Sequence, residues 1–330
     1  MKKTIFTISL LILISLPTPS LSQHCNKNDE TTLFQIKKAL GNPYHLTSWK
    51  KTEDCCTWYS IKCNKATGRI IELNIFSGNI SGQIPTEVGN LPYLQTLDFH
   101  KLTNLTGQIP SSISKLTNLN YLILSWNDLS GPVPSFLSQL KNLNYLDLSF
   151  NKLTGSIPPQ LATLPKLTEL NLGRNKLTGV IPESFGMFKA LQSIHLSHNQ
   201  LTGNVPKSLG LLNFSTVDFS RNQLTGDLSM LFGKSKTIHS AYMSRNGFQF
   251  DLSKMVFPSS LEWLDLSHNK IYGSLPATLT GLRLQNLDVS YNMLCGKIPQ
   301  GGDMQKIETS SYLHNRCLCG SPLPACSKRS

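Results

Sequence analysis

One leucine-rich phrase recurs through most of this chain at an almost constant interval of about 24 residues. In its most regular form it reads Leu-x-x-Leu-x-Leu-x-x-Asn-x-Leu-x-Gly-x-Ile-Pro, as at residues 143–158 and 167–182. A unit of this size cannot bury its own apolar face and has to stack on its neighbours. The period therefore predicts a solenoid of ten turns within residues 70–299. The turns are marked by Gly82, Gly107, Gly131, Gly155, Gly179, Gly203, Gly226, Phe250 in place of Gly, Gly273 and Gly296.

Each part of the phrase has a structural role. Leu-x-Leu alternation is typical of a short strand, and one strand per turn predicts a long parallel sheet along one side. The recurrent Asn follows that strand, where its amide can satisfy buried backbone groups of adjacent turns. Gly permits the bend that follows. We therefore interpret as structural the Asn residues at 127, 151, 175, 199, 222, 246, 269 and 292.

Three turns depart from the phrase. Gly78 stands where the recurrent Asn of the first turn is expected; we call this the ladder position of a turn. The second turn carries one extra residue within 99–104, so the alignment of Lys101 with the repeat is left open. The eighth turn, at 246–252, has no Gly-x-Ile-Pro. We expect a local irregularity there.

The two ends of the chain predict a secreted protein with capped termini. Residues 1–22 have the basic start, apolar core and small residues before the cleavage point of a secretory signal. Residues 23–69 and 300–330 flank the repeats, and residues 29–40 have the apolar spacing of a helix. No other stretch is apolar enough to cross a membrane, so no membrane anchor is expected.

Eight cysteines divide equally between the two ends, and none lies in the regular repeats: Cys25, Cys55, Cys56 and Cys63, then Cys295, Cys317, Cys319 and Cys326. In an oxidising compartment this pattern favours disulfides that stabilise the caps, and each cap allows three pairings. A zinc site is the weaker interpretation, because Cys-x-Cys at 317–319 is poor ligand spacing. No metal or other cofactor is predicted.

The chain is basic, with a formal net charge of +12, or +10 without Lys2 and Lys3. A basic secreted protein favours acidic surfaces, such as an acidic polysaccharide or an acidic partner protein. No nucleic-acid-binding module is recognisable, so no nucleic-acid partner is expected. Sequons begin at Asn79, Asn104 and Asn213, where N-glycans are predicted.

Residues on the strand face are the candidate binding residues, because the strand side of a solenoid is concave. Large cationic and aromatic side chains, which dominate interface energetics, stand just before each ladder position. The position between the two inward Leu residues carries Asp in several turns, which repeat consensus explains as well as function does. The candidates are Lys101, Trp126, Phe150, Arg174, His198, Arg221, Arg245, His268 and Tyr291, with His195, Tyr242 and Trp263 from neighbouring strand positions.

An enzyme is a poor interpretation of these residues. His195, His198 and Asp218 come near one another on adjacent strands, but no nucleophile motif, phosphate loop or metal-spaced cluster accompanies them. Stacked carboxylates could resemble a glycosidase pair, but an open face does little to exclude water or raise a pKa. We predict a binding protein.

The whole chain after the leader resembles the plant polygalacturonase-inhibiting proteins. The resemblance rests on the Leu-Thr-Gly-x-Ile-Pro phrase, the ten turns, Cys-Cys-x-Trp at 55–58 and the C-terminal motifs at 294–302 and 317–324. It implies a right-handed α/β leucine-rich-repeat solenoid with a concave parallel sheet, a second sheet near the Leu-x-Gly segment and disulfide-bonded caps. It also implies the disulfides Cys25–Cys55, Cys56–Cys63, Cys295–Cys317 and Cys319–Cys326.

The function that the resemblance implies is defence in the plant cell wall. The protein would bind fungal polygalacturonases with its concave face and block access to pectin. The residues allow three alternatives: a pectin-binding wall protein, an ice-binding relative, or a soluble partner of leucine-rich-repeat receptor kinases. The sequence leaves the target enzyme and the oligomeric state open.

Overall fold

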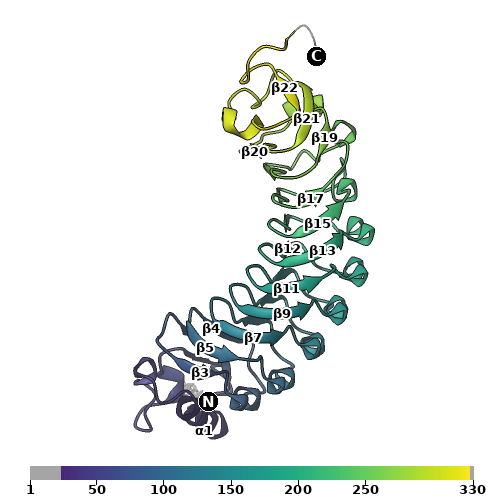
Figure 1. The fold of residues 1–330 in the computed structure, drawn as a ribbon. Helices are drawn as coiled ribbons and strands as arrows, with labels where there is room; N and C mark the ends of the chain where they lie inside the picture. Colours follow the sequence, from purple (N-terminus) through teal and green to yellow (C-terminus); the bar gives the residue numbers. More distant parts are fainter. Residues whose placement is uncertain (1–23, 328–330) are drawn as a thin grey trace, which may run out of the picture.

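The computed structural model describes residues 24–327, which form a curved solenoid that runs from one cap to the other (Figure 1). The predicted signal segment, 1–22, lies outside the described residues. The first element is α1 (Lys27–Ala39), whose N-terminal cap is the Asn26 side chain. Leu33 and Ile36 on its inner face are fully buried. The helix predicted over 29–40 is confirmed, and the cap explains why it begins two residues earlier.

The main sheet has eleven strands and follows the concave side of the solenoid (Figure 1). One strand from each of the ten turns pairs in parallel with the next, while β1 is antiparallel to β2. Leu146, Leu170 and Ile194 lie side by side in this register, so the inward residues form one continuous core. The strands are β1 (Ile61–Cys63), β2 (Ile70–Phe76), β4 (Thr96–His100), β6 (Tyr121–Ile123), β8 (Tyr145–Asp147), β10 (Glu169–Asn171), β12 (Ser193–His195), β14 (Thr216–Asp218), β16 (Ser240–Tyr242), β18 (Trp263–Asp265) and β20 (Asn286–Asp288).

The second sheet forms where the Leu-x-Gly segments of neighbouring turns meet, as the resemblance implies. It is interrupted after β17, because the eighth turn lacks the Gly phrase and makes only a single bridge, Asp251 to Tyr272, with the next turn. The predicted irregularity is therefore confirmed. Eight strands lie before the break and three after it: β3 (Ser81–Gln83), β5 (Asn104–Gly107), β7 (Asp128–Pro132), β9 (Lys152–Ser156), β11 (Lys176–Gly179), β13 (Gln200–Asn204), β15 (Gln223–Gly226) and β17 (Gly247–Phe248), then β19 (Tyr272–Gly273), β21 (Met293–Lys297) and β22 (Cys317–Cys319).

Short 3-10 helices follow along the convex side (Figure 1). Most begin directly after the Pro of the repeat, whose fixed φ and missing N–H suit the start of a helix. They are η3 (Thr86–Asn90), η4 (Ser111–Lys115), η5 (Ser135–Gln139), η6 (Pro159–Thr163), η7 (Glu183–Met187), η8 (Lys207–Leu211), η9 (Ser229–Leu231), η10 (Leu252–Lys254) and η11 (Ala277–Gly281), with η1 (Tyr44–Leu46), η2 (Cys55–Thr57) and η12 (Thr309–Tyr312) in the caps.

The recurrent Asn residues form a hydrogen-bonded ladder. The Asn175 Nδ2 group donates to the carbonyl of Leu172 in its own turn and to that of Leu148 in the preceding turn. Its Oδ1 accepts the buried N–H of Leu153, 3.0 Å away. The structural interpretation of these residues is confirmed, and Asn315 extends the ladder into the C-terminal cap.

The alignment of the second turn is settled by the same ladder. The Leu102 N–H donates to Asn127 Oδ1, and Lys101 has the same left-handed backbone as Trp126 in the next turn. The extra residue therefore follows Lys101. Lys101 belongs with the other candidate residues that precede the ladder.

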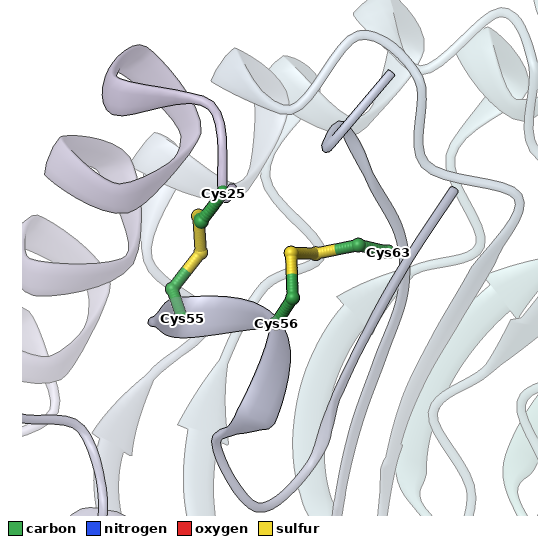
Figure 2. A group of neighbouring side chains, drawn as sticks. All are labelled: Cys25, Cys55, Cys56 and Cys63. Atoms are coloured by element: carbon green, nitrogen blue, oxygen red, sulfur yellow. A yellow bond between two sulfur atoms is a disulfide. The ribbon is translucent and has the colours of Figure 1, made fainter. Parts of the chain in front are cut away.

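Disulfides fasten both caps. Cys25 at the start of α1 is bonded to Cys55, and Cys56 is bonded to Cys63 of β1 (Figure 2). The C-terminal pairs are Cys295–Cys317 and Cys319–Cys326, so all four pairs match those that the resemblance implies. The four N-terminal sulfurs lie within 4.8 Å of one another, but they are engaged in two disulfides and are not the thiolates that zinc requires.

An ion pair fixes α1 to the first turn. Asp29 is 1% exposed and accepts two hydrogen bonds from the Arg69 guanidinium, at 2.8 and 2.9 Å. It also accepts the N–H of Ile70 at the start of β2. The Arg69 guanidinium in turn lies 4.2 Å from the centre of the Tyr93 ring. Within residues 24–327, no helix has the length and apolar character needed to cross a membrane.

Candidate functional site

The nine residues that precede the ladder positions form one continuous series along the edge of the main sheet, which we call the left-handed row. Their φ angles lie between 53° and 57°, and none of them is glycine. From Phe150 to Tyr291 the backbone of each is held by both neighbours: the Arg174 N–H donates to Ser197 of the next turn, and its carbonyl accepts from Asn151 of the preceding turn. The row consists of Lys101, Trp126, Phe150, Arg174, His198, Arg221, Arg245, His268 and Tyr291.

A left-handed backbone costs an ordinary L-residue about 1 kcal/mol, which glycine avoids. A solenoid selected for stability alone would therefore carry Gly at some of these nine positions. The row instead carries long cationic or aromatic side chains, and strain of this kind concentrates at functional sites. The row is thus a candidate recognition surface on physical grounds as well as by composition.

The aromatic members of the row stack on one another. The rings of Trp126 and Phe150 lie 3.6 Å apart at 12°, and the Arg174 guanidinium covers the Phe150 ring at 4.8 Å. At the other end, Tyr291 contacts His268 with ring centres 4.1 Å apart. These contacts fix the side chains in place, so a partner would meet a partly ordered surface.

The middle of the row is cationic. Arg174, Arg221 and Arg245 are exposed, with His198 between the first two and His268 next after the third. Burial lowers the pKa of His198 below its ordinary value of 6.5, and Arg174 and Arg221 lower it further. Burial, together with the charge of Arg245, lowers the pKa of His268 in the same way. Protonation of both imidazoles is therefore disfavoured in the free protein, and a nearby anion would favour it.

The other three candidates lie on the same sheet outside the row. His195 pairs with Asn171 and Asp218 on the adjacent strands, and Tyr242 occupies the same position in β16. Trp263 begins β18 and is 37% exposed. His195 lines one shallow hollow together with Phe150, Arg174 and His198 of the row. Tyr242 and Trp263 lie further along the same sheet.

The recurrent Asp residues have a local structural role. Asp147, Asp218, Asp265 and Asp288 each accept the backbone N–H of the Ser two residues later, at 2.9 to 3.0 Å. This bond shapes the turn that leads into the left-handed residue. Consensus thus explains these carboxylates.

The catalytic alternative has no support in this geometry. Asp218 Oδ1 accepts both the N–H and the hydroxyl of Ser220. Among the described hydrogen bonds and ion pairs, none joins His195 or His198 to that carboxylate. The arrangement needed to orient a general base is therefore missing from this part of the chain.

Sequence reasoning missed two residues that extend the row at its ends. Ser77 has φ 53° and precedes Gly78 in the first turn. His314 has φ 59° and stacks on Tyr291 with ring centres 4.1 Å apart. It was overlooked because cysteines replace the Leu-Thr-Gly phrase that marks the other turns. The Asn315 ladder residue beside it was the signal that could have identified it.

The three sequons are exposed. Asn79 and Asn104 lie on adjacent turns beside the second sheet, where the Asn104 Nδ2 group donates to Asn79 Oδ1 at 2.9 Å. Asn213 lies between η8 and β14, before the strand. None of these positions overlaps the row, so glycans there would leave the row accessible.

Comparison with known proteins gives the family. A leucine-rich repeat region model matches residues 69–223, and a leucine-rich repeat N-terminal domain model matches residues 26–64. Polygalacturonase inhibitor 1 of Arabidopsis thaliana is 57% identical over 324 residues, which cover 97% of this chain and 98% of the relative. This chain belongs to the plant polygalacturonase-inhibiting protein family. The polygalacturonase inhibitor of Vitis vinifera, also 57% identical, covers 97% of this chain and 96% of its own length.

Solved structures show the same scaffold in proteins with other partners. A plant ice-binding protein superposes with a TM-score of 0.92 at 52% identity, covering 93% of this chain and all of that chain. The ectodomain of the Arabidopsis receptor kinase HAESA, in complex with a peptide hormone, gives 0.68 at 29% identity over 89% of this chain and 53% of its own. Because this fold serves several functions, the function of the row has to be inferred from its side chains and not from the fold.

Proposed function

We propose that this polygalacturonase-inhibiting-family protein is secreted to the plant cell wall, carries N-glycans and inhibits fungal polygalacturonases. The observation that carries the proposal is the left-handed row, which holds Lys, Arg, His and aromatic side chains at nine positions where glycine would be less strained. Near full-length identity to named inhibitors supports the same target. We further propose that residues 23–69, 70–299 and 300–330 act as cap, repeats and cap.

The mechanism we propose is steric and non-covalent. The cationic middle of the row, formed by Arg174, Arg221 and Arg245, would dock beside the acidic cleft of the enzyme, and the flanking aromatic stacks would supply buried contact area. Complementary charge would mainly speed encounter and select partners. The inhibitor would then cover the cleft and exclude the polysaccharide.

The test is reducing-sugar release from polygalacturonic acid by a panel of fungal polygalacturonases, with and without the disulfide-intact protein. Dose-dependent inhibition of one enzyme supports the proposal. No inhibition across a broad panel contradicts it and favours the alternative functions. Pectin binding is then tested with demethylated pectin, and partnership with receptor kinases is tested by co-purification.

Ice binding is the second candidate because of the similarity to a plant ice-binding protein. The surface it would use is the second sheet, where Thr106, Thr154, Thr178, Thr202 and Thr225 repeat one exposed position. However, the hydroxyls of Thr106 and Thr202 donate to glycine carbonyls of the preceding turn, which engages part of the array. A thermal-hysteresis assay distinguishes this candidate from the inhibitor.

Binding is expected to strengthen as the pH falls. The His198 pKa is lowered in the free protein by burial and by Arg174 and Arg221, whereas carboxylates of a bound enzyme would raise it. Between the two pKa values the complex holds more protons than the free protein, so affinity rises as pH falls through this window and levels off below the free value. The gain is up to about tenfold for each unit by which the pKa rises. Calorimetry at a series of pH values measures it.

The control for the pH effect is the double variant His198→Asn, His268→Asn, because Asn tolerates the left-handed backbone. This variant should bind with a flatter pH profile. An unchanged profile would show that the titrating groups belong to the enzyme.

Glycine in the row is expected to stabilise the fold and weaken inhibition. Arg245→Gly relieves the left-handed strain, so the free energy of unfolding should rise by about 1 kcal/mol. The matched control is Lys176→Gly, an exposed residue of β11 with ordinary φ, which should lose about 1 kcal/mol and keep inhibition. Urea denaturation and inhibition assays measure both. A destabilised Arg245→Gly variant would contradict the strain argument.

A further inference from the structure

One arginine of the left-handed row is held by a ring before any partner arrives. The Cζ atom of Arg174 lies 4.8 Å from the centre of the Phe150 ring in the preceding turn. The Trp126 ring, one turn earlier still, is stacked on Phe150 with ring centres 3.6 Å apart at 12°. Because the indole covers one face of the Phe150 ring, the guanidinium lies over the other face. Phe150 is thus enclosed between an indole and a cation, and three successive turns contribute to one stack.

The other two arginines of the row have no such support. Within residues 24–327, the one other guanidinium that lies over a ring is that of Arg69 in the N-terminal cap. Arg221 and Arg245 are exposed and have no ring contact in the same part of the chain. A free arginine side chain loses rotamer freedom when a partner fixes it. Of the three, Arg174 is therefore the one whose conformations are restricted in the unbound protein.

The donors of Arg174 are available to a partner although the side chain is restricted. Among the described hydrogen bonds and ion pairs, none involves its guanidinium. Asp218 lines the same shallow hollow, but its Oδ1 accepts the N–H and the hydroxyl of Ser220 and forms no ion pair with Arg174. A contact with a ring face attracts the positive charge and leaves the N–H groups of the guanidinium fork free to donate. Arg174 is both positioned and unpaired.

We propose that Phe150 is a positioning residue of the inhibitory surface, which holds Arg174 in the conformation that meets the bound polygalacturonase. The proposal rests on the proposed function and identifies a residue that acts through another. Phe150 is half-buried and both of its ring faces are covered, so little of the ring is left for direct contact with the enzyme. Restricting one rotamer-rich side chain in advance is worth about two- to tenfold in affinity.

The decisive variant is Phe150→Leu, which keeps an apolar side chain and a Cβ on the left-handed backbone but removes the ring. Inhibition should weaken about fivefold, because Arg174 then has to be ordered on binding. Phe150→Tyr keeps the ring and should inhibit like the unmodified protein. If Phe150 acts through Arg174, Phe150→Leu causes no further loss in an Arg174→Gln background. In the matched Arg221→Gln background, where the exchanged arginine has no ring contact, Phe150→Leu should weaken inhibition as much as it does alone.

Two measurements decide the proposal. In the inhibition assay, a loss on Phe150→Leu that is as large in the Arg174→Gln background as without it shows direct contact with the enzyme and overturns the positioning role. Unchanged inhibition by Phe150→Leu overturns that role too, whereas no inhibition by the unmodified protein overturns the proposed function.

The second measurement needs no enzyme and separates these two failures. In NMR relaxation of the free protein, the Arg174 Nε–H group should be ordered in the unmodified protein and in Phe150→Tyr, and mobile in Phe150→Leu. Equal mobility in all three proteins overturns the positioning role, whatever the inhibition assay shows.

Discussion

The double charge reversal Arg221→Glu, Arg245→Glu is expected to abolish inhibition, with a loss of at least about 100-fold. Both side chains are exposed in the cationic middle of the left-handed row, and they lie between His198 and His268. Each reversal replaces an attraction to an acidic cleft by a repulsion, and like charges across an interface cost several kcal/mol. Inhibition constants from the reducing-sugar assay measure the loss.

The matched control reverses two lysines away from the concave face. Lys176→Glu, Lys270→Glu produces the same change in net charge at exposed positions beside the second sheet. This control variant should inhibit within a few-fold of the unmodified protein. Inhibition by the unmodified protein should itself weaken as the salt concentration rises towards about 0.5 M, because salt screens the charges. If both double variants lose inhibition equally, overall charge and not the row is responsible. If the row variant keeps inhibition, the electrostatic docking model is wrong.

Asp29→Ala is expected to destabilise the N-terminal cap more than any surface substitution. The carboxylate is 1% exposed and satisfies the Arg69 guanidinium and the Ile70 N–H together. Removing one partner of a buried ion pair leaves an uncompensated charge and costs about 4 kcal/mol. Urea denaturation measures the loss, which should appear as earlier unfolding of α1 with the first turn.

An exposed ion pair provides the comparison. Glu72→Gln breaks the contact with Lys62, whose side chain is 63% exposed, and should cost less than about 1 kcal/mol. An Asp29→Ala variant as stable as Glu72→Gln would show that the cap is held by its disulfides and packing and not by the Asp29–Arg69 pair.

The periodic features of the fold could be predicted from sequence because each repeats in every turn. The spacing of Leu and Asn predicted ten strands, a continuous core and the Asn ladder, and all three are present in the structure. The missing phrase at 246–252 likewise predicted a local irregularity, and the structure shows it as a break in the second sheet. A feature that recurs in ten turns can be recognised from many positions of the sequence, whereas a feature of one turn can be recognised from that turn alone.

The backbone conformation of the row could not be predicted from the sequence. Positive φ is usually signalled by Gly, so a row of Arg, His and aromatic residues gave no sign of its left-handed backbone.

The most direct test of the left-handed row as the inhibitory surface is hydrogen–deuterium exchange of this protein with and without an inhibited polygalacturonase. If the row is the inhibitory surface, binding will slow exchange in peptides spanning 195–199, 218–222 and 242–246, at the ends of β12, β14 and β16. Exchange in the second sheet and the η helices should be unchanged. Protection confined to the second sheet or the convex side, with none along the row, would show that the row is not the inhibitory surface.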